Sequence, residues 1–432
     1  MKTASRLKPA PSRQALVPRE SANTAISALP KPPAVCETLG EAVPRVLSEA
    51  GRIQFLYDKI LDLAEDTRLM LQLHIHQLAM HMIHVGASDM DAGGPASNEV
   101  VWYRVDGVKK PHNELGSASS DQMDILILSL LSDAQVKKLI NEYSVDFSYS
   151  IAGEDMMRPR RFRASVYFDE ENLAINLRVV RDEIRPLDSL GFHGSVQKGL
   201  LFSSIRDGLT LIAGATGAGK TTTLDAIIDA NNQTVNGHIV VIGDPIEYRH
   251  QSEKCIVRHR EIGRGVASFK DGIVQALHQD PDMIVIGEML SPGTISAALD
   301  ATDSGHRVFS TIHTRSAIES IERIIAEYPS IEQDRVRARL GDVLNCIVAQ
   351  KLCPSKDGGR VLAKEVLWVT PSVRAAIKNN NLSEIYQMMW EGTQAGMHTL
   401  EQDLHRLFRK GIINAEVALS YANNKKRMRQ ML

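Results

Sequence analysis

Residues 208–230 read GLTLIAGATGAGKTTTLDAIIDA, and this stretch decides the fold of the chain. Residues 209–213 form a short apolar run that is typical of a buried strand. Residues 214–221 match the pattern G-x-x-x-x-G-K-[ST], and residues 222–230 have helical character. This motif requires a strand before it and a helix after it, and both patterns are present. The stretch therefore predicts a phosphate-binding loop in an α/β sheet and not a chance glycine-rich turn.

Each residue type in the loop has a chemical reason for its place. Glycines let the backbone wrap closely around phosphate oxygens and point successive N–H groups at them, and the positive end of the following helix adds to the attraction. Lys220 supplies a positive charge to the β and γ phosphates, and Thr221 offers a hydroxyl ligand to Mg²⁺. ATP and Mg²⁺ are the predicted cofactors. The predicted nucleotide-binding residues are Gly214, Ala215, Thr216, Gly217, Ala218, Gly219, Lys220, Thr221 and Thr222.

Three further apolar runs end in polar residues. Residues 238–242 lead into GDPIE, residues 283–286 lead into Gly-Glu, and residues 307–311 lead into Ile-His-Thr. In open parallel sheets, ligands bind beyond the carboxyl ends of the strands, so the polar residues after these runs are expected near Lys220. These residues are Asp244, Glu247, Glu288 and His313.

Glu288 is the predicted catalytic base. A carboxylate at the end of this strand is where a hydrolytic ATPase positions its water, and Glu288 is also expected to hold Mg²⁺ through a water molecule. For His306 and His313, direct chemistry and a packed, hydrogen-bonded polar side chain remain alternatives. The further catalytic candidates are Asp244, Glu247, His306, His313 and Lys220.

The sequence divides into three predicted regions. Residues 1–36 mix six prolines with serine, alanine and basic residues, and a disordered arm is expected because proline removes donors and stiffens the chain. Residues 37–190 combine a helical pattern over residues 39–86 with short β-like runs around one helix at residues 121–142, which predicts a small α+β domain. Residues 191–432 are expected to form the ATPase domain with C-terminal helices.

Composition restricts the class of protein. The 432 residues are 43% hydrophobic and 24% charged with a net charge of -2, which is ordinary for a globular protein and not typical of a polyanion binder. The four cysteines are too scattered for a disulfide framework. The first residues lack the apolar segment of a secretory signal, and no apolar run approaches the ~18 residues of a membrane span. A cytoplasmic protein is expected, and any contact with a membrane is expected to come through a partner or a surface.

Three longer motifs carry a resemblance to a known family. They are RHREIG at residues 258–263, ALHQDPDMIVIGEM at residues 276–289 and DSGHRVFSTIHT at residues 303–314, and they resemble the type II/type IV secretion ATPase superfamily, which includes PilT-like motors. The resemblance covers residues 146–422. It implies a hexameric ring whose subunits have an N-terminal α+β (PAS-like) domain and a RecA-like P-loop ATPase domain, with ATP bound between them.

The resemblance also implies that arginines of the N-terminal domain reach the triphosphate. Arg163 and Arg178 stand where these arginines are expected, and a surface strand arginine is the alternative for each. The chain departs from the family pattern at four positions, which carry Gly243, His278, Leu290 and Ser291. These departures leave Glu288 in place and shift more of the positioning of Mg²⁺-bound water to Asp244 and Glu247.

Several features suggest which machine the ATPase serves. Cys353 has no second cysteine pair, so the zinc insert of type II assembly motors is not expected. Residues 376–383 are a degraded form of the retraction-motor signature. Together with the proline-rich arm, this combination resembles the ATPases of Dot/Icm-type (type IVB) secretion and plasmid conjugation. The expected partners are further copies of the chain in a homohexamer and inner-membrane secretion-complex proteins, including another ATPase. A pilus retraction-type motor is the alternative.

Two other classes of protein are alternatives to a motor. A DNA-handling RecA-like protein needs a basic channel with aromatics, but aromatics are only 5% of the chain, and nucleic acid is not expected as a direct ligand. The basic run at residues 425–429 is interpreted as a frayed, solvated end. A nucleotide-dependent scaffold without turnover is disfavoured because Lys220, Thr221 and Glu288 are all present.

Overall fold

The structure is a computed structural model that describes residues 31–432 except residues 45, 106, 152–159 and 181–183. Most of the predicted arm, residues 1–30, lies outside the described residues. The chain divides into two compact units, one of Met1–Leu130 with Asp169–Ala174 and one of Leu131–Phe168 with Ile175–Leu432. The boundaries proposed after residues 36 and 190 stay a prediction.

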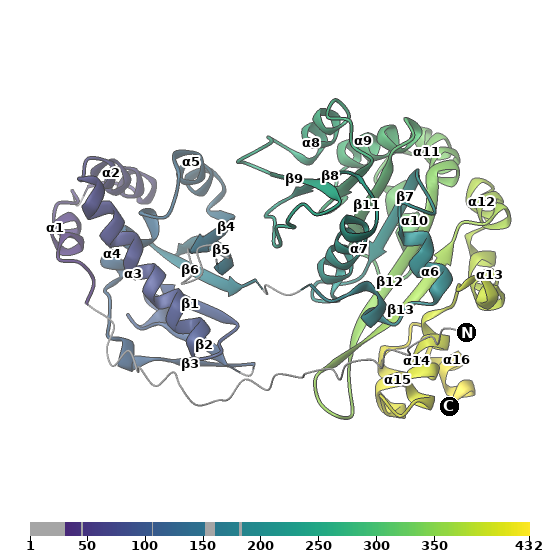
Figure 1. Ribbon diagram of the computed structural model, residues 1–432. Coiled ribbons are helices and arrows are strands. Elements are labelled where there is room, and N and C mark those ends of the chain that lie inside the picture. The colour runs from purple at the N-terminus through teal and green to yellow at the C-terminus, as the bar shows by residue number, and fades with distance from the viewer. Residues whose placement is uncertain (1–30, 45, 106, 152–159, 181–183) are drawn as a thin grey trace, which may run out of the picture. The chain divides into compact units, whose positions relative to one another are not determined.

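The first unit combines helices with short antiparallel strands (Figure 1). β1 pairs with β2, and β2 pairs with β3, both antiparallel. Tyr103 of β2 is buried, and its hydroxyl donates to the carbonyl of Leu78 in α3 at 2.7 Å, which ties the strands to the longest helix. The elements are α1 (Val35–Glu41), α2 (Glu49–Leu61), α3 (Glu65–His84), β1 (Asp89–Gly93), β2 (Trp102–Val105), β3 (Val108–Pro111) and α4 (Ser120–Leu128).

A buried carboxylate holds the first unit together. Asp124 of α4 is fully buried and accepts hydrogen bonds from Arg52 of α2 at 2.5 Å, from the Leu173 N–H at 2.6 Å and from the Asn172 amide at 2.8 Å. Burial raises the pKa of Asp124 to about 6, and the positive charge of Arg52 works in the opposite direction. The carboxylate is therefore a stabilising centre, and its removal would leave the buried Leu173 N–H without this acceptor.

We expect Asp124→Ala to lower the free energy of unfolding by about 3–5 kcal/mol, because it removes the fully buried partner of Arg52 and the acceptor of the buried Leu173 N–H. Urea unfolding followed by circular dichroism measures this loss. Asp121→Ala is the matched control, since Asp121 binds the same Arg52 at 2.6 Å from an exposed position. Its cost should stay below about 1 kcal/mol. Equal losses for the two variants would contradict the assignment.

The chain continues with a helix and three strands, which are α5 (Asp133–Glu142), β4 (Ser144–Ile151), β5 (Arg160–Asp169) and β6 (Asn172–Val179). Residues 169–174 of this segment belong to the first unit and the rest to the second. The six-stranded sheet has the order β3-β2-β1-β6-β5-β4. The expectation of one helix over residues 121–142 is wrong. α4 ends at Leu128, and α5 starts anew after Ser132, whose backbone N–H donates to the side chain of Gln135 at 2.8 Å and so marks a new helix start.

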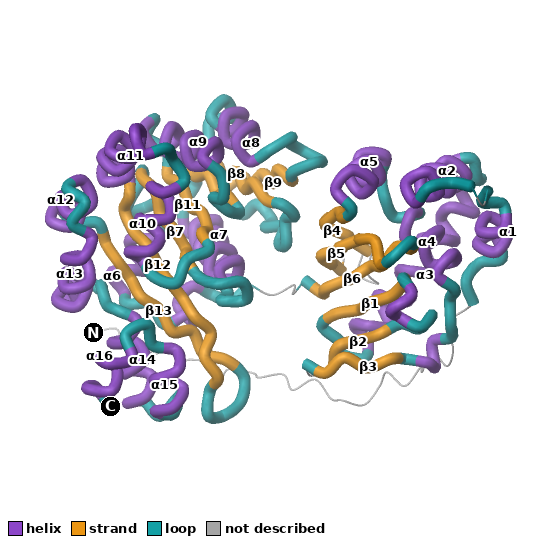
Figure 2. The backbone as a smooth tube through the Cα atoms, turned by 180° about the vertical axis from the view of Figure 1, so that it is seen from behind, coloured by secondary structure: helices purple, strands orange, loops and turns teal. Residues whose placement is uncertain are grey.

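A seven-stranded sheet forms the predicted ATPase part of the second unit (Figure 2). Its order is β13-β12-β7-β11-β10-β8-β9, and every neighbouring pair is parallel except β12 with β13. The α/β fold class with a parallel ATPase sheet is thereby confirmed. The strands are β7 (Gly208–Ala213), β8 (Gly237–Gly243), β9 (Cys255–Glu261), β10 (Met283–Ile286), β11 (Arg307–Ile312), β12 (Leu344–Pro354) and β13 (Arg360–Trp368).

Helices cover both faces of this sheet. Leu209 and Leu211 of β7 face one apolar core and Ile212 faces the other, as the two-residue period of a strand requires. The core around Ile212 includes α6 (Gly194–Leu200) and α7 (Lys220–Thr234). The opposite core includes α8 (Phe269–Ala276), α9 (Pro292–Asp303), α10 (Ala317–Ala326), α11 (Ser330–Val343), α12 (Pro371–Lys378) and α13 (Ile385–Glu391).

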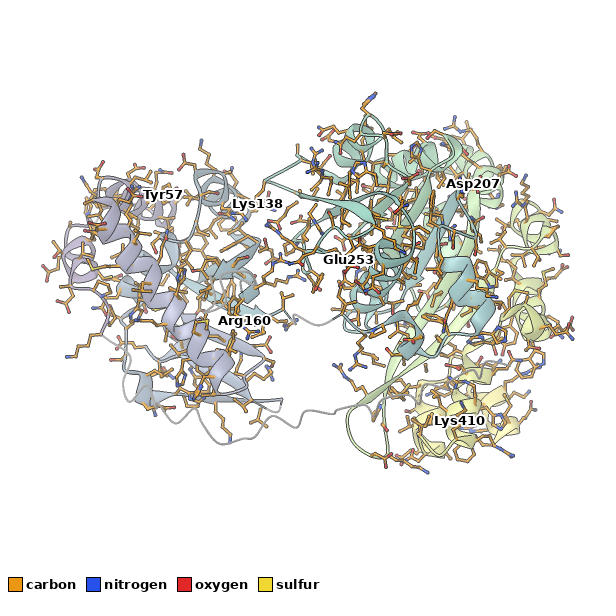
Figure 3. The ribbon with its side chains drawn as sticks, in the orientation of Figure 1. Tyr57, Lys138, Arg160, Asp207, Glu253 and Lys410 are labelled. Atoms are coloured by element: carbon orange, nitrogen blue, oxygen red, sulfur yellow. The ribbon has the colours of Figure 1, made fainter. Side chains whose placement is uncertain are left out.

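Three helices follow at the C-terminus, α14 (Leu400–Arg409), α15 (Ala415–Tyr421) and α16 (Lys425–Met431). In Figure 3, Lys410 marks the end of α14 in this group. The interpretation of residues 425–429 as a frayed end is wrong. Met428 is fully buried, and the guanidinium of Arg427 lies 3.9 Å from the ring centre of Trp390, so packing and a cation–π contact hold α16 in place.

Candidate nucleotide-binding site

The phosphate loop connects the end of β7 to the start of α7. Both elements are labelled in Figure 1. Residues 215–217 are exposed, and so is Thr221. Gly217 and Gly219 have φ angles of 78° and 87°, in the left-handed region that glycine adopts at no steric cost. The loop is an open cradle at the N-terminus of a 15-residue helix, where N–H groups and the helix dipole favour an anion.

Lys220 is folded back onto the loop. Its Nζ donates to the carbonyls of Gly214 at 2.9 Å and Ala215 at 3.2 Å, and it lies 3.5 Å from Nδ1 of His313. Burial lowers the pKa of Lys220, and the negative charge of Glu288 raises it in part. The ammonium group is therefore held at the mouth of the cradle by neutral carbonyls, which phosphate oxygens can replace as stronger, charge-assisted partners.

Glu288 and His313 meet beside this lysine. Glu288 follows β10 and His313 follows β11, and these two strands are parallel neighbours. Oε2 of Glu288 lies 3.7 Å from Nε2 of His313. The hydroxyl of Thr311 donates to the carbonyl of Gly287 at 2.6 Å, which holds the segment that carries Glu288. Three neighbouring strands, β7, β11 and β10, thus bring Lys220, Glu288 and His313 together at their carboxyl ends.

Glu247 reaches the loop from the end of β8. Burial raises the pKa of Glu247, whereas the charges of Arg163 and Arg178 and a hydrogen bond from the Thr221 hydroxyl lower it. Nη1 of Arg163 lies 3.5 Å from Oε1 of Glu247, and Nη2 lies 3.3 Å from Oδ2 of Asp146. Glu247 is thus linked to the start of α7, and both predicted arginines act on its charge.

Asp244 belongs to the charge cluster around Arg163. Desolvation raises the pKa of Asp244, Lys138 and Arg163 lower it, and the negative charges of Asp146 and Glu261 raise it further. Its electrostatic neighbours therefore come from α5, β4, β5 and β9. Asp244 and Glu247 share Arg163 as a cationic neighbour.

The structure does not bring His306 to the phosphate loop of its own chain. His306 precedes β11, and its Nδ1 lies 3.0 Å from the hydroxyl of Ser304 and 3.2 Å from the carbonyl of Ala301. His313 lies just beyond the other end of this six-residue strand, seven residues on and about 23 Å away at ~3.3 Å per residue. Within one chain, His306 is a hydrogen-bonded residue at the amino edge of the sheet.

Two residues beside the site escaped the sequence analysis. Arg161 of β5 donates to the carbonyls of Ile246 and Glu247, each at 2.7 Å, and so holds the segment that carries Glu247. No local pattern marks this role. Gln350 of β12 binds the loop itself, and here a signal was present, because Gln350 is a polar residue that ends the apolar run of residues 346–349. The same rule had singled out Glu288.

The residues present fit Mg²⁺ bound together with a nucleotide. Within the described residues, no group of three or more His, Cys, Asp and Glu side chains is arranged to hold a metal ion. Mg²⁺ does not need such a cage, because it keeps several waters and takes phosphate oxygens with one or two protein ligands. The exposed Thr221 hydroxyl, with Glu247 as its hydrogen-bond acceptor, meets that requirement.

Comparison with known proteins gives a family match and similar solved structures. The family model of type II/IV secretion system proteins matches residues 65–418. The type IV pilus retraction ATPase PilT of Pseudomonas aeruginosa is 35% identical over 348 residues, which are 80% of this chain and 97% of that protein. The crystal structure of the pilus retraction motor PilT with bound ADP has a TM-score of 0.71 at 35% identity and covers 82% of this chain and 98% of its own.

A more distant structure shares the fold alone. The ATPase DotB of Legionella pneumophila has a TM-score of 0.70 at 23% identity and covers 80% of this chain and 94% of its own. Fold and site together define the class of P-loop ATPases. The chain belongs to the family of type II/IV secretion system proteins and is an ATP-hydrolysing enzyme, which confirms the predicted superfamily. Within the part of the chain that the structure describes, no helix is long and apolar enough to span a bilayer.

Proposed function

We propose that this chain is the motor of a type IV secretion machine, in which Lys220 binds the phosphates of ATP and Glu288 orients the attacking water. The observation that carries the proposal is the meeting of Lys220, Glu288 and His313 at the ends of three neighbouring strands. Phosphoryl transfer needs a positive charge at the phosphates and a group that positions the nucleophile, and these residues supply both. His313, with Nε2 3.7 Å from Oε2 of Glu288, is the proposed neighbour that orients this carboxylate.

Thr221 and, through a water molecule, Glu288 are proposed to hold Mg²⁺. The bound ion neutralises charge on the phosphate oxygens. Glu247 accepts a hydrogen bond from the Thr221 hydroxyl, which leaves the oxygen lone pairs of Thr221 for the metal. Asp244 and Glu247 then position the waters around it. His306 has no role in this scheme within one chain.

Arg163 and Arg178 are proposed to stabilise the charge that builds on the transferred phosphoryl group. The Arg163 guanidinium is divided between Asp146 and Glu247, and all three side chains are roughly two-fifths exposed. Exposed ion pairs of this kind contribute little, about 0–1 kcal/mol, so the guanidinium can leave them for a developing charge.

The working form is proposed to be a homohexamer. We would measure ATP hydrolysis by the purified chain together with its mass in solution, with ATP and Mg²⁺ present. Six copies of 47.7 kDa give a ring of 286 kDa. Turnover by a species of that mass supports the ring motor. A monomer that binds ATP without turnover favours a nucleotide-dependent scaffold instead.

We assign the motor to type IVB, conjugation-type secretion because of the degraded retraction signature at residues 376–383 and the proline-rich arm at residues 1–36. Its partners are then inner-membrane secretion-complex proteins, including another ATPase, on the cytoplasmic side. A pilus retraction-type motor is the second candidate, and the 35% identity to a retraction ATPase over 80% of the chain supports it.

Deletion of the gene in its host separates the two candidates when plasmid transfer and twitching motility are both measured. Loss of transfer with normal twitching supports conjugation-type secretion. Loss of twitching with normal transfer supports a retraction motor. If neither changes, both assignments are wrong. Complementation with the wild-type gene is the control.

A further inference from the structure

Strand β12 extends beyond the end of β7 and passes beneath the phosphate loop. The two strands are parallel neighbours, and Ala349 of β12 pairs with Ala213, the last residue of β7. Gln350 is therefore the first residue beside the loop. The approach is close, because a Cβ atom on Gly214 would lie 2.8 Å from the carbonyl oxygen of Gln350. The Gln350 side chain is 2% exposed and lies on the α7 side of the sheet.

Both ends of the Gln350 amide are engaged by the nucleotide site. Nε2 donates to the carbonyl of Ala218 in the loop at 2.9 Å. Oε1 accepts from the Thr223 hydroxyl, in the first turn of α7, at 3.0 Å. Because Thr223 takes the oxygen of the amide, the amide nitrogen is left facing Ala218. One side chain thus joins the loop, the helix and the neighbouring strand.

The bond to Ala218 has a consequence for the next N–H group. In a planar trans peptide, the carbonyl and the following N–H point in opposite directions. Holding the Ala218 carbonyl against β12 therefore turns the Gly219 N–H away from the sheet, toward the side where phosphate binds. Gly219 has no Cβ, so the Ala218–Gly219 peptide could adopt other orientations if its carbonyl were not held.

We propose that Gln350 is a positioning residue for the phosphates, which acts by locking the Ala218–Gly219 peptide in its anion-binding orientation. The inference rests on the proposed nucleotide site. Without the lock, the cradle loses a preorganised N–H donor to a charged ligand. Binding of ADP and binding of ATP should be weakened to a similar extent, because the Gly219 N–H donates to the phosphates and not to the attacking water.

Gln350→Met is the direct test, because methionine keeps the length of the side chain and removes both hydrogen bonds. We expect the Kd for ADP, measured by calorimetry, and the KM for ATP to rise about 10- to 100-fold, the usual worth of a hydrogen bond to a charged group. The kcat at saturating ATP should fall less than about 3-fold. Gln350→Glu should weaken ADP binding similarly, because it keeps an acceptor for Thr223 but offers no donor to Ala218.

Two matched controls separate positioning from stability. Val348→Ala removes a fully buried side chain from the same face of β12, two residues earlier, and should lower Tm while leaving the Kd for ADP unchanged. Thr223→Ser keeps the hydroxyl that orients Gln350 and should bind ADP normally, whereas Thr223→Val should weaken binding. An ADP Kd within 2-fold of wild type in Gln350→Met or Gln350→Glu overturns the proposal, whatever happens to Tm.

The two proposals fail in different ways. Unchanged ADP binding in Lys220→Ala would remove the nucleotide site itself and the positioning role with it. Normal ADP binding in the Gln350 variants alone would leave the proposed site intact and reduce Gln350 to a buried, hydrogen-bonded core residue.

Discussion

Glu288→Gln should lower kcat for ATP hydrolysis by about 10²- to 10⁴-fold, the usual contribution of a positioned general base. Glutamine keeps the size of the side chain and its hydrogen-bonding capacity, but it cannot accept the proton of the attacking water. Binding of ATP should change little, because the phosphates are held by the loop and by Lys220. The variant is therefore expected to trap ATP, and steady-state hydrolysis alongside equilibrium binding of ATP measures the two effects.

Glu253→Gln is the control for this substitution. Glu253 is an exposed glutamate of the same unit, labelled in Figure 3, and the same chemical change there should leave kcat unaltered. If Glu288→Gln retained more than about a third of the wild-type turnover, another residue would have to orient the water. His313, 3.7 Å from Glu288, would then be the next candidate to substitute.

Lys220→Ala should weaken binding of ADP and ATP by at least about 10²-fold and abolish measurable hydrolysis. Charge-assisted hydrogen bonds from an ammonium group to phosphate are roughly twice as strong as neutral ones, and this lysine faces the centre of the cradle. Its removal also takes away the hydrogen bonds that Lys220 donates to the carbonyls of Gly214 and Ala215. Calorimetry with ADP reports the loss directly and does not depend on turnover.

Lys410→Ala controls for the loss of a lysine as such, since Lys410 is exposed at the end of α14. Its ADP affinity should equal that of the wild type. Unfolding curves for both variants show whether the effect comes from the missing charge or from a disturbed fold. Tight ADP binding by Lys220→Ala would refute the assignment of the loop as the nucleotide site.

Local sequence patterns were sufficient to predict the phosphate loop and its flanking elements. The strand before the loop, the glycines of the loop and the helix after it follow one another in sequence, so their geometry is a matter of short-range preference. The residues after β8, β10 and β11 could be placed at one edge because parallel strands all end on the same side. Glu247, Glu288 and His313 do lie close to loop residues.

Local signals failed where a distant partner decides the outcome. The basic run at residues 425–429 is too polar to predict packing, yet Trp390 and the core of α14 hold it as a helix. The sequence motif that includes His306 does not indicate how far this residue lies from the phosphate loop. Only the course of β11 shows that His306 and His313 lie at opposite ends of the strand.

The sequence alone determined the class of fold, the phosphate loop and the acid that follows β10, because each depends on residues within one turn or one strand. Only the tertiary structure decided that β12, more than a hundred residues further along the chain, lies beside β7 and places Gln350 under the loop. Strand order is set by how apolar faces pack over the whole sheet, and no local pattern records which buried strand becomes the neighbour of another.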